Sequence, residues 1–170
     1  HLPCTCVHMA DARGIMAGMT ALDTARATYA DAATAFLDLA AQLPPERYAG
    51  PGLGNWDLRA LVGHTGRSFV TVTTYLATRA DRVACEDAAD YFAVVSRLAH
   101  GATRDAIHQR GVEAGVLLGD DPLGALRASY EEAELALELL EDEDVVVDTA
   151  GGGMRVSDYL ATRTFELTVH

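Results

Sequence analysis

Apolar residues recur every three or four positions in several separate segments of the chain, and this period predicts packed amphipathic helices. The clearest segment runs from about Thr20 to Gln42, where polar residues fall between the apolar ones. Pro44 and Pro45 end it, because proline has no backbone N–H and disfavours a helical residue before it. The following residues 46–55 are rich in glycine and proline and predict a loop.

Later segments carry the same period or a residue that favours a helix end. They predict helices over residues 57–80, from 87 onward with a break near 101, over 122–141 and over 157–170. Asp57 and Ser157 are the predicted N-caps, and Pro122 suits a first helical turn. Three valines followed by three glycines, residues 145–153, predict a short extended piece and a flexible turn, too short to found a sheet. The sequence therefore predicts an all-α, up-down four-helix bundle with irregular connections.

Charge and hydropathy exclude several classes of partner. The 25 acidic residues outnumber the 13 basic ones, which gives a formal net charge of −12 at pH 7. A chain this acidic is not expected to bind nucleic acid or an anionic membrane surface. Its apolar runs are also shorter than the roughly 20 residues that cross a bilayer. An alanine-rich helix face with Ala25, Ala32 and Ala33 suits close packing within or between subunits, so a homodimer is left open.

The first 16 residues are expected to be a disordered leader or a non-native extension, and residues 17–170 a single helical domain. The leader holds a Cys-x-Cys-x-His cluster made of Cys4, Cys6 and His8. This cluster lacks the two- to four-residue loop that usually separates zinc-binding cysteines. With Cys85 the cysteine count is odd, so we expect no disulfide framework. Without a signal peptide, this predicts a reducing, cytoplasmic location.

Three side chains are candidates for a metal site. Glu166 and His170 are four positions apart, which places both on one face of a helix. If the helix that carries His64 packs beside them, two imidazoles and a carboxylate can bind one divalent ion with a coordination position left open. Spacing alone leaves the alternative that the pair is a coincidence and that His64 is an ordinary core or surface histidine. The other helical histidines, His100 and His108, have no obvious partner and are expected to be exposed.

The segments around these ligands resemble the signatures of the DinB/YfiT-like superfamily, most closely the N-terminal domain of mycothiol-dependent maleylpyruvate isomerases. Trp56 stands eight residues before His64, as in the family, and the intervening helix closes with Leu-Val-Gly-His where the family has Leu-Val-Ala-His. The family pattern Tyr-Leu-x-x-Arg-x-x-Glu-x-x-x-His is matched by Tyr159, Leu160, Arg163, Glu166 and His170. The likeness extends from about Ala17 to the last residue.

This resemblance implies a metal triad of His64, Glu166 and His170 that holds zinc or nickel at one end of the bundle. It also implies mycothiol as a cosubstrate, whose thiolate attacks an electrophilic carbon in an isomerisation or S-transfer reaction. Arg163 is expected to orient the ligand carboxylate or to pair with an anionic substrate, with an ion pair to a neighbouring acid as the alternative. Trp56 and Tyr159 are expected to pack near the site.

Some features separate this chain from the family isomerases. Ala60 stands where the family often has an aspartate, and Gly63 is expected to loosen the helix beside the candidate ligand. The isomerases carry a second domain that helps to form the substrate site, so we expect the native protein to continue past His170. Two alternatives to an enzyme are left open. One is a non-catalytic metal-binding stress, sensor or interaction domain, and the other is a bundle whose vestigial site serves only dimerisation.

Overall fold

The protein is described by a computed structural model that covers residues 19–101, 104–140, 142 and 144–170. Its elements in chain order are helix α2 (Ala21–Ala41), the 3-10 helix η1 (Pro45–Ala49), α3 (Leu58–Leu76), α4 (Ala88–Gly101), α5 (Arg104–Leu117), α6 (Pro122–Glu138), strands β1 (Val146–Thr149) and β2 (Gly152–Arg155), and α7 (Val156–Val169). None of the described helices is both long enough and apolar enough to span a membrane.

Capping side chains explain where three of the helices begin. Thr20 caps α2 in a reciprocal capping box with Asp23. The Asp57 carboxylate accepts a hydrogen bond from the third backbone N–H of α3, and Asp121 does the same for α6, whose first residue is Pro122. The predicted starts of these helices are confirmed. The predicted break near residue 101 is also confirmed, because separate helices lie on either side of it.

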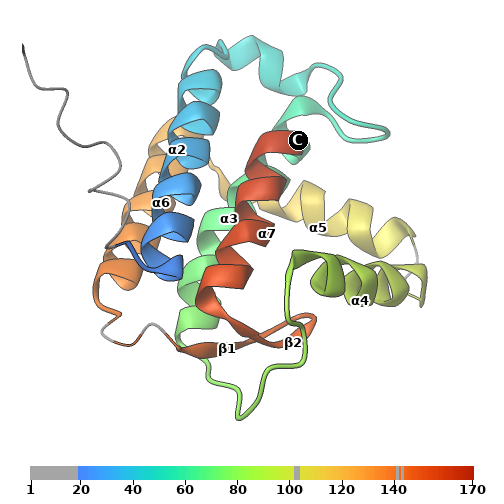
Figure 1. Ribbon diagram of the computed structural model, residues 1–170. Helices are drawn as coiled ribbons and strands as arrows, with labels where there is room; N and C mark the ends of the chain where they lie inside the picture. Colours follow the sequence, from blue (N-terminus) through green and yellow to red (C-terminus); the bar gives the residue numbers. More distant parts are fainter. Residues whose placement is uncertain (1–18, 102–103, 141, 143) are drawn as a thin grey trace, which may run out of the picture.

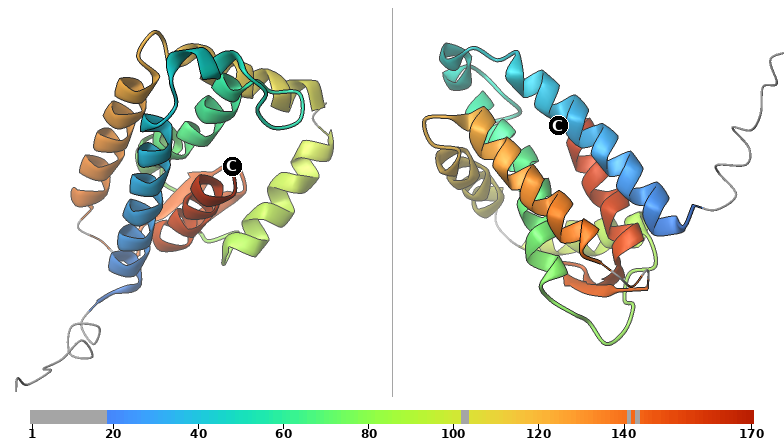
Figure 2. Two further views of the ribbon diagram at one scale, coloured as in Figure 1. Left: turned by 90° about the horizontal axis from the view of Figure 1, so that it is seen from above. Right: turned by 90° about the vertical axis from the view of Figure 1, so that its left-hand side faces the viewer.

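Helices α2, α3, α6 and α7 form a bundle, and α4 and α5 flank it on the side of α3 and α7 (Figures 1 and 2). Helices α2 and α7 run in one direction, whereas α3 and α6 run in the other (Figure 2). The pair α4–α5 is the long connection that allows α3 and α6 to run in the same direction. The predicted all-α bundle is confirmed, and its irregular connection is this helical pair.

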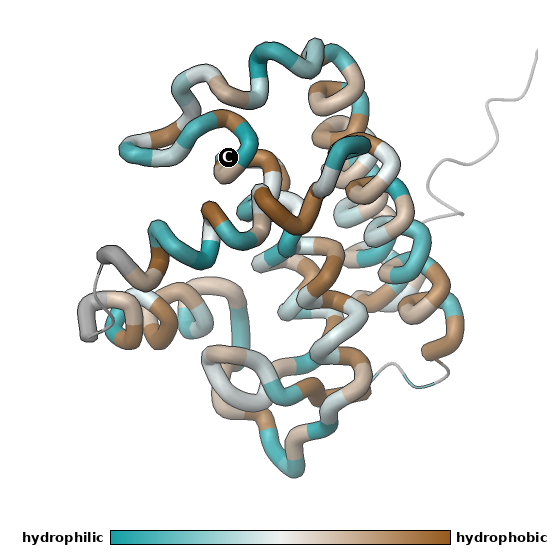
Figure 3. Tube along the Cα trace, turned by 180° about the vertical axis from the view of Figure 1, so that it is seen from behind, coloured by the Kyte–Doolittle hydropathy of each residue, from teal (hydrophilic) through white to brown (hydrophobic). Residues whose placement is uncertain are grey.

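Aromatic side chains fill the centre of the bundle between α2, α3 and α6. The Phe69 ring contacts the rings of Tyr29, Phe36 and Tyr130, with centroids 5.3–6.3 Å apart. Brown apolar and teal polar stretches alternate along the helices in Figure 3, as amphipathic helices require. Ala32 and Ala33 are buried in this same core. The alanine-rich face is therefore used within the chain, and the homodimer stays a prediction without support from that face.

Several sequence expectations are corrected. The extended piece does found a sheet: β1 pairs antiparallel with β2, and backbone hydrogen bonds from residues 80, 84 and 85 tie the α3–α4 connection to this hairpin. The glycine stretch supplies β2 because Gly152 adopts a φ of 103°, which glycine tolerates. Helix α7 starts directly after β2, so its N-cap is Arg155, without a side-chain cap, and Ser157 lies inside the first turn.

Other differences are smaller. Helix α3 ends at Leu76, four residues before the predicted end, and the predicted loop 46–55 contains most of η1. The leader with Cys4, Cys6 and His8 lies outside the described residues, so its interpretation stays a prediction. Cys85 is a free, buried cysteine whose Sγ donates a hydrogen bond to the carbonyl of Gly151.

Candidate metal centre

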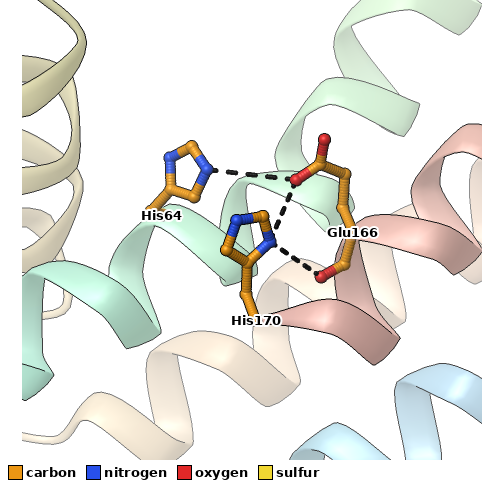
Figure 4. A group of neighbouring side chains, drawn as sticks. All are labelled: His64, Glu166 and His170. Carbon is orange, nitrogen blue, oxygen red and sulfur yellow. Dashed lines mark hydrogen bonds and ion pairs between the residues drawn. The ribbon is translucent and has the colours of Figure 1, made fainter. Parts of the chain in front are cut away.

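The three predicted ligands meet at one end of the bundle (Figure 4). His64 comes from α3, Glu166 from the end of α7, and His170 follows that helix. One ligand atom from each residue lies within 4.8 Å of the other two. Glu166 Oε2 is 3.2 Å from His170 Nδ1 and 4.0 Å from His64 Nε2. Helical spacing brings Glu166 and His170 together, and the antiparallel packing of α3 against α7 brings His64.

This arrangement fits a small divalent ion. Metal–ligand bonds of about 2.0–2.2 Å place tetrahedral nitrogen and oxygen ligands roughly 3.3–3.5 Å apart. The observed separations of 3.2 and 4.0 Å are close to that spacing, so small side-chain rotations suffice. The side chains are 20–25% exposed, which leaves room for a non-protein ligand. Within the described part of the chain, this is the only cluster of three or more histidine, cysteine or acidic side chains with such geometry.

His64 is held in the form that binds metals. Burial and the nearby charge of His170 lower the pKa of His64 to about 4, and the attraction of Glu166 offsets only part of this effect. The imidazole is therefore neutral near neutral pH, with a free lone pair for a metal ion.

Glu166 and His170 act on each other in the opposite way. Burial tends to raise the pKa of Glu166, but the hydrogen bond from His170 and the charge of Arg163 outweigh it, so the pKa is lowered. The same hydrogen bond raises the pKa of His170 above its ordinary value, although burial acts against it. Glu166 is thus a carboxylate, and a proton competes with a metal ion for His170.

Zinc affinity is expected to fall when the pH is lowered from about 8 to about 6, because His170 gains its proton in this range and must lose it to bind metal. His64 does not contribute to the loss, since its pKa of about 4 lies below the range. Zinc titrations by calorimetry in buffers of different ionisation enthalpy measure both the affinity and the protons released. An affinity that stays constant over this range, with no proton release, would contradict the assignment of His170 as a ligand.

Trp56 packs directly against His64, as predicted. Its ring centroid lies 4.6 Å from that of His64, and its Nε1 donates a 2.9 Å hydrogen bond to the carbonyl of His108 on α5. The His108 ring also stacks on Trp56. The expectation that His108 is an exposed histidine without partners is therefore wrong, because α5 folds back over α3 and covers Trp56. The His100 side chain lies outside the described residues.

Gly111 on α5 leaves the space that the Trp56 ring occupies, since an added methyl group would lie closer than 3.0 Å to three of its atoms. Replacing Gly111 with alanine is expected to displace the ring and lower zinc affinity by up to about tenfold, the lower limit for loss of a partner that orients a ligand. Zinc titrations and the emission of Trp56, the only tryptophan, measure the two effects.

Val116→Ala is the matched control, because Val116 is an exposed residue of α5 that does not contact Trp56. An unchanged zinc affinity in Gly111→Ala, together with unchanged emission, would show that Trp56 does not orient His64.

Arg163 lies on α7 one turn before Glu166 and is only 8% exposed. Its guanidinium carbon lies 5.5 Å from the ring centre of Tyr91 and 5.1 Å from that of Tyr159. Nε donates a hydrogen bond to Thr162 Oγ1, and Nη2 donates one to the Tyr91 hydroxyl. Tyr159 is fully buried and thus supports Arg163 rather than reaching the ligands directly. Among the described residues, no carboxylate forms an ion pair with Arg163, so the alternative of a simple ion pair is not observed.

A cavity of about 460 Å³ opens beside the three candidate ligands. Its walls come from α3, α4, α5 and α7, and its lining includes His64, Glu166 and Arg163. Sequence reasoning missed two further cationic residues of this lining, Arg67 and Arg110. Arg67 carried a usable signal, because it follows His64 by three positions and shares its helix face. Arg110 carried none, because its place depends on how α5 folds back.

Fold and site together define a DinB-like helical bundle with a two-histidine, one-carboxylate cluster beside a cavity. The family model of the mycothiol maleylpyruvate isomerase N-terminal domain matches residues 29–170. The chain therefore belongs to this family, and the resemblance found in its motifs is confirmed. Searches of curated proteins and of solved structures found no match.

Proposed function

We propose that this chain is a divalent-metal-binding domain that works with a small thiol of the mycothiol class as an isomerase or S-transferase. The observation that carries the proposal is the position of His64 and Glu166, which contribute to the candidate ligand cluster and also line the 460 Å³ cavity. Membership of the mycothiol maleylpyruvate isomerase N-terminal domain family supports the thiol as the cosubstrate.

Each ligand has a defined part in this proposal. His64 offers a neutral imidazole, Glu166 a negative charge, and His170 a second imidazole after losing its proton. Imidazole and carboxylate ligands suit zinc or nickel. A bound ion would supply the charge that keeps a thiol deprotonated near neutral pH. The cavity would hold the electrophile next to that thiol and limit the access of water.

The alternative is a metal-binding sensor or interaction domain without turnover. Structural zinc sites usually have four protein ligands and are closed to solvent. Here the described residues supply three ligands, their side chains are partly exposed, and a cavity large enough for a small molecule adjoins them. These observations favour catalysis over a purely structural ion.

Metal analysis and thiol binding test the proposal together. The purified protein is expected to contain close to one zinc or nickel ion per chain, and mycothiol is expected to bind the metal-loaded form but not the chelator-treated form. His64→Ala should abolish both properties, whereas Arg127→Gln on the exposed face of α6 should change neither. Absence of bound metal, with melting unaffected by added zinc, would refute the metal site. Metal without thiol binding would favour the sensor alternative.

A further inference from the structure

Arg163 is a buried cation without a buried counterion. Arginine is rarely this buried unless it is paired, because a charge loses most of its hydration inside a protein. The two tyrosine rings that sandwich the guanidinium offer cation–π attraction, which is worth about 0.5–2 kcal/mol per contact and compensates only part of that loss. Arg163 therefore lacks a partner that an anion could provide.

The guanidinium also has unused hydrogen-bond donors. Arginine carries five N–H groups, and Arg163 uses one on Nε and one on Nη2. Arg163 lines the cavity beside the candidate ligands, so the remaining donors can be reached by a molecule in this cavity. Two parallel N–H groups of a guanidinium match the two oxygens of a carboxylate.

The cavity reverses the charge balance of the whole chain. The protein carries 25 acidic and 13 basic residues, but the cavity lining includes Arg67, Arg110 and Arg163 and only one acid, Glu166. The three arginines come from three different helices, α3, α5 and α7, so the fold itself gathers them. Arg67 and Arg110 are exposed, whereas Arg163 is buried.

We propose that the cavity binds an organic carboxylate, with one carboxylate group on Arg163 and a second negative group near Arg67 and Arg110. The proposal deepens the proposed function, because it makes the electrophile an acid that is held beside the metal-bound thiol. Binding of the anion itself depends on the arginines rather than on the metal. Glu166 repels an anion in the metal-free protein, so a bound divalent ion is expected to increase the affinity.

Calorimetric titration with succinate, and with the neutral succinamide as its match, tests this inference in zinc-loaded and chelator-treated protein. Succinate is expected to bind both forms, more tightly with zinc, and succinamide neither. Arg163→Met should weaken succinate binding at least about tenfold, because a charge-assisted bidentate pair is lost. Arg110→Gln should weaken it less and reduce its salt dependence, whereas Arg127→Gln on α6 should have no effect.

Thermal melting separates a binding role of Arg163 from a structural one. Without succinate, Arg163→Met is expected to melt at or above the native temperature, because the variant no longer buries an unpaired charge. Unchanged succinate affinity in Arg163→Met, equal binding of succinamide, or no succinate binding in either form would each overturn the inference. If the protein holds no metal but still binds succinate through Arg163, the carboxylate site stands and the metal-dependent function fails.

Discussion

Replacing Glu166 with glutamine is expected to lower zinc affinity by more than the roughly 10- to 100-fold that follows loss of a partner outside the coordination sphere. Two effects add up. The variant removes the only negative charge of the cluster, and glutamine offers a neutral amide oxygen in its place. It also removes the hydrogen-bonded carboxylate that fixes the His170 ring. Zinc competition titrations with a chelating dye measure the loss.

The fold should survive this change, which makes the result easy to interpret. The Glu166–His170 pair is partly exposed, and such pairs contribute about 0–1 kcal/mol to stability. Native protein and Glu166→Gln are therefore expected to melt within a few degrees of each other in a chelator. Added zinc should raise the melting temperature of the native protein alone, because a ligand stabilises the folded state that binds it.

Glu131→Gln is the matched control, since it removes the same charge from the exposed face of α6. It should bind zinc as the native protein does. Equal zinc affinity in Glu166→Gln and in this control would show that Glu166 is not a ligand, and the metal centre would then have to be abandoned.

The candidate ligands could be predicted because their geometry is mostly local. Glu166 and His170 are one helical turn apart, and the eight-residue spacing between Trp56 and His64 marks the partner helix. Helix starts at Thr20, Asp57 and Pro122 were equally predictable, since each depends on a side chain that bonds to its own first turn. Such features need no knowledge of the tertiary structure.

Features that depend on long-range packing could not be predicted. His108 contacts Trp56 only because α5 folds back over α3, and Gly152 joins a strand only because β1 lies beside it. The cationic cavity is of the same kind. Arg67 and Arg110 are separated by more than forty residues in the sequence and line the same cavity only in the folded chain.

Gly63 shows how the structure changes the interpretation of a single residue. The sequence suggests that this glycine merely loosens the helix before His64, where related proteins carry alanine. In the structure, a methyl group at Gly63 would overlap the backbone of Ala114 and Gly115 on α5. Gly115 is restricted in the same way by the backbone of Arg59 and Ala60. The two glycines therefore permit α3 and α5 to touch through their backbones, and this contact places α5 over Trp56.

Replacing Gly63 with alanine is expected to destabilise the protein by about 1–3 kcal/mol, the usual effect of overpacking, although alanine favours a helix over glycine by up to about 1 kcal/mol. The overlap dominates because it is with backbone, which cannot rotate away as a side chain can. A loss of this size corresponds to a melting temperature roughly 2–12 °C lower for a chain of this length. Urea unfolding followed by circular dichroism measures the free energy.

Because α5 carries the groups that hold Trp56 against His64, the displacement should also reach the metal centre. Gly63→Ala is expected to change Trp56 emission and weaken zinc binding, whereas Val70→Ala, on the exposed side of α3, should change neither. Stability equal to or greater than that of the native protein would mean that propensity outweighs the overlap and that α5 is free to move away from α3. Lower stability with unchanged zinc affinity and emission would mean that α5 adjusts without moving Trp56, and that the contact supports the fold alone.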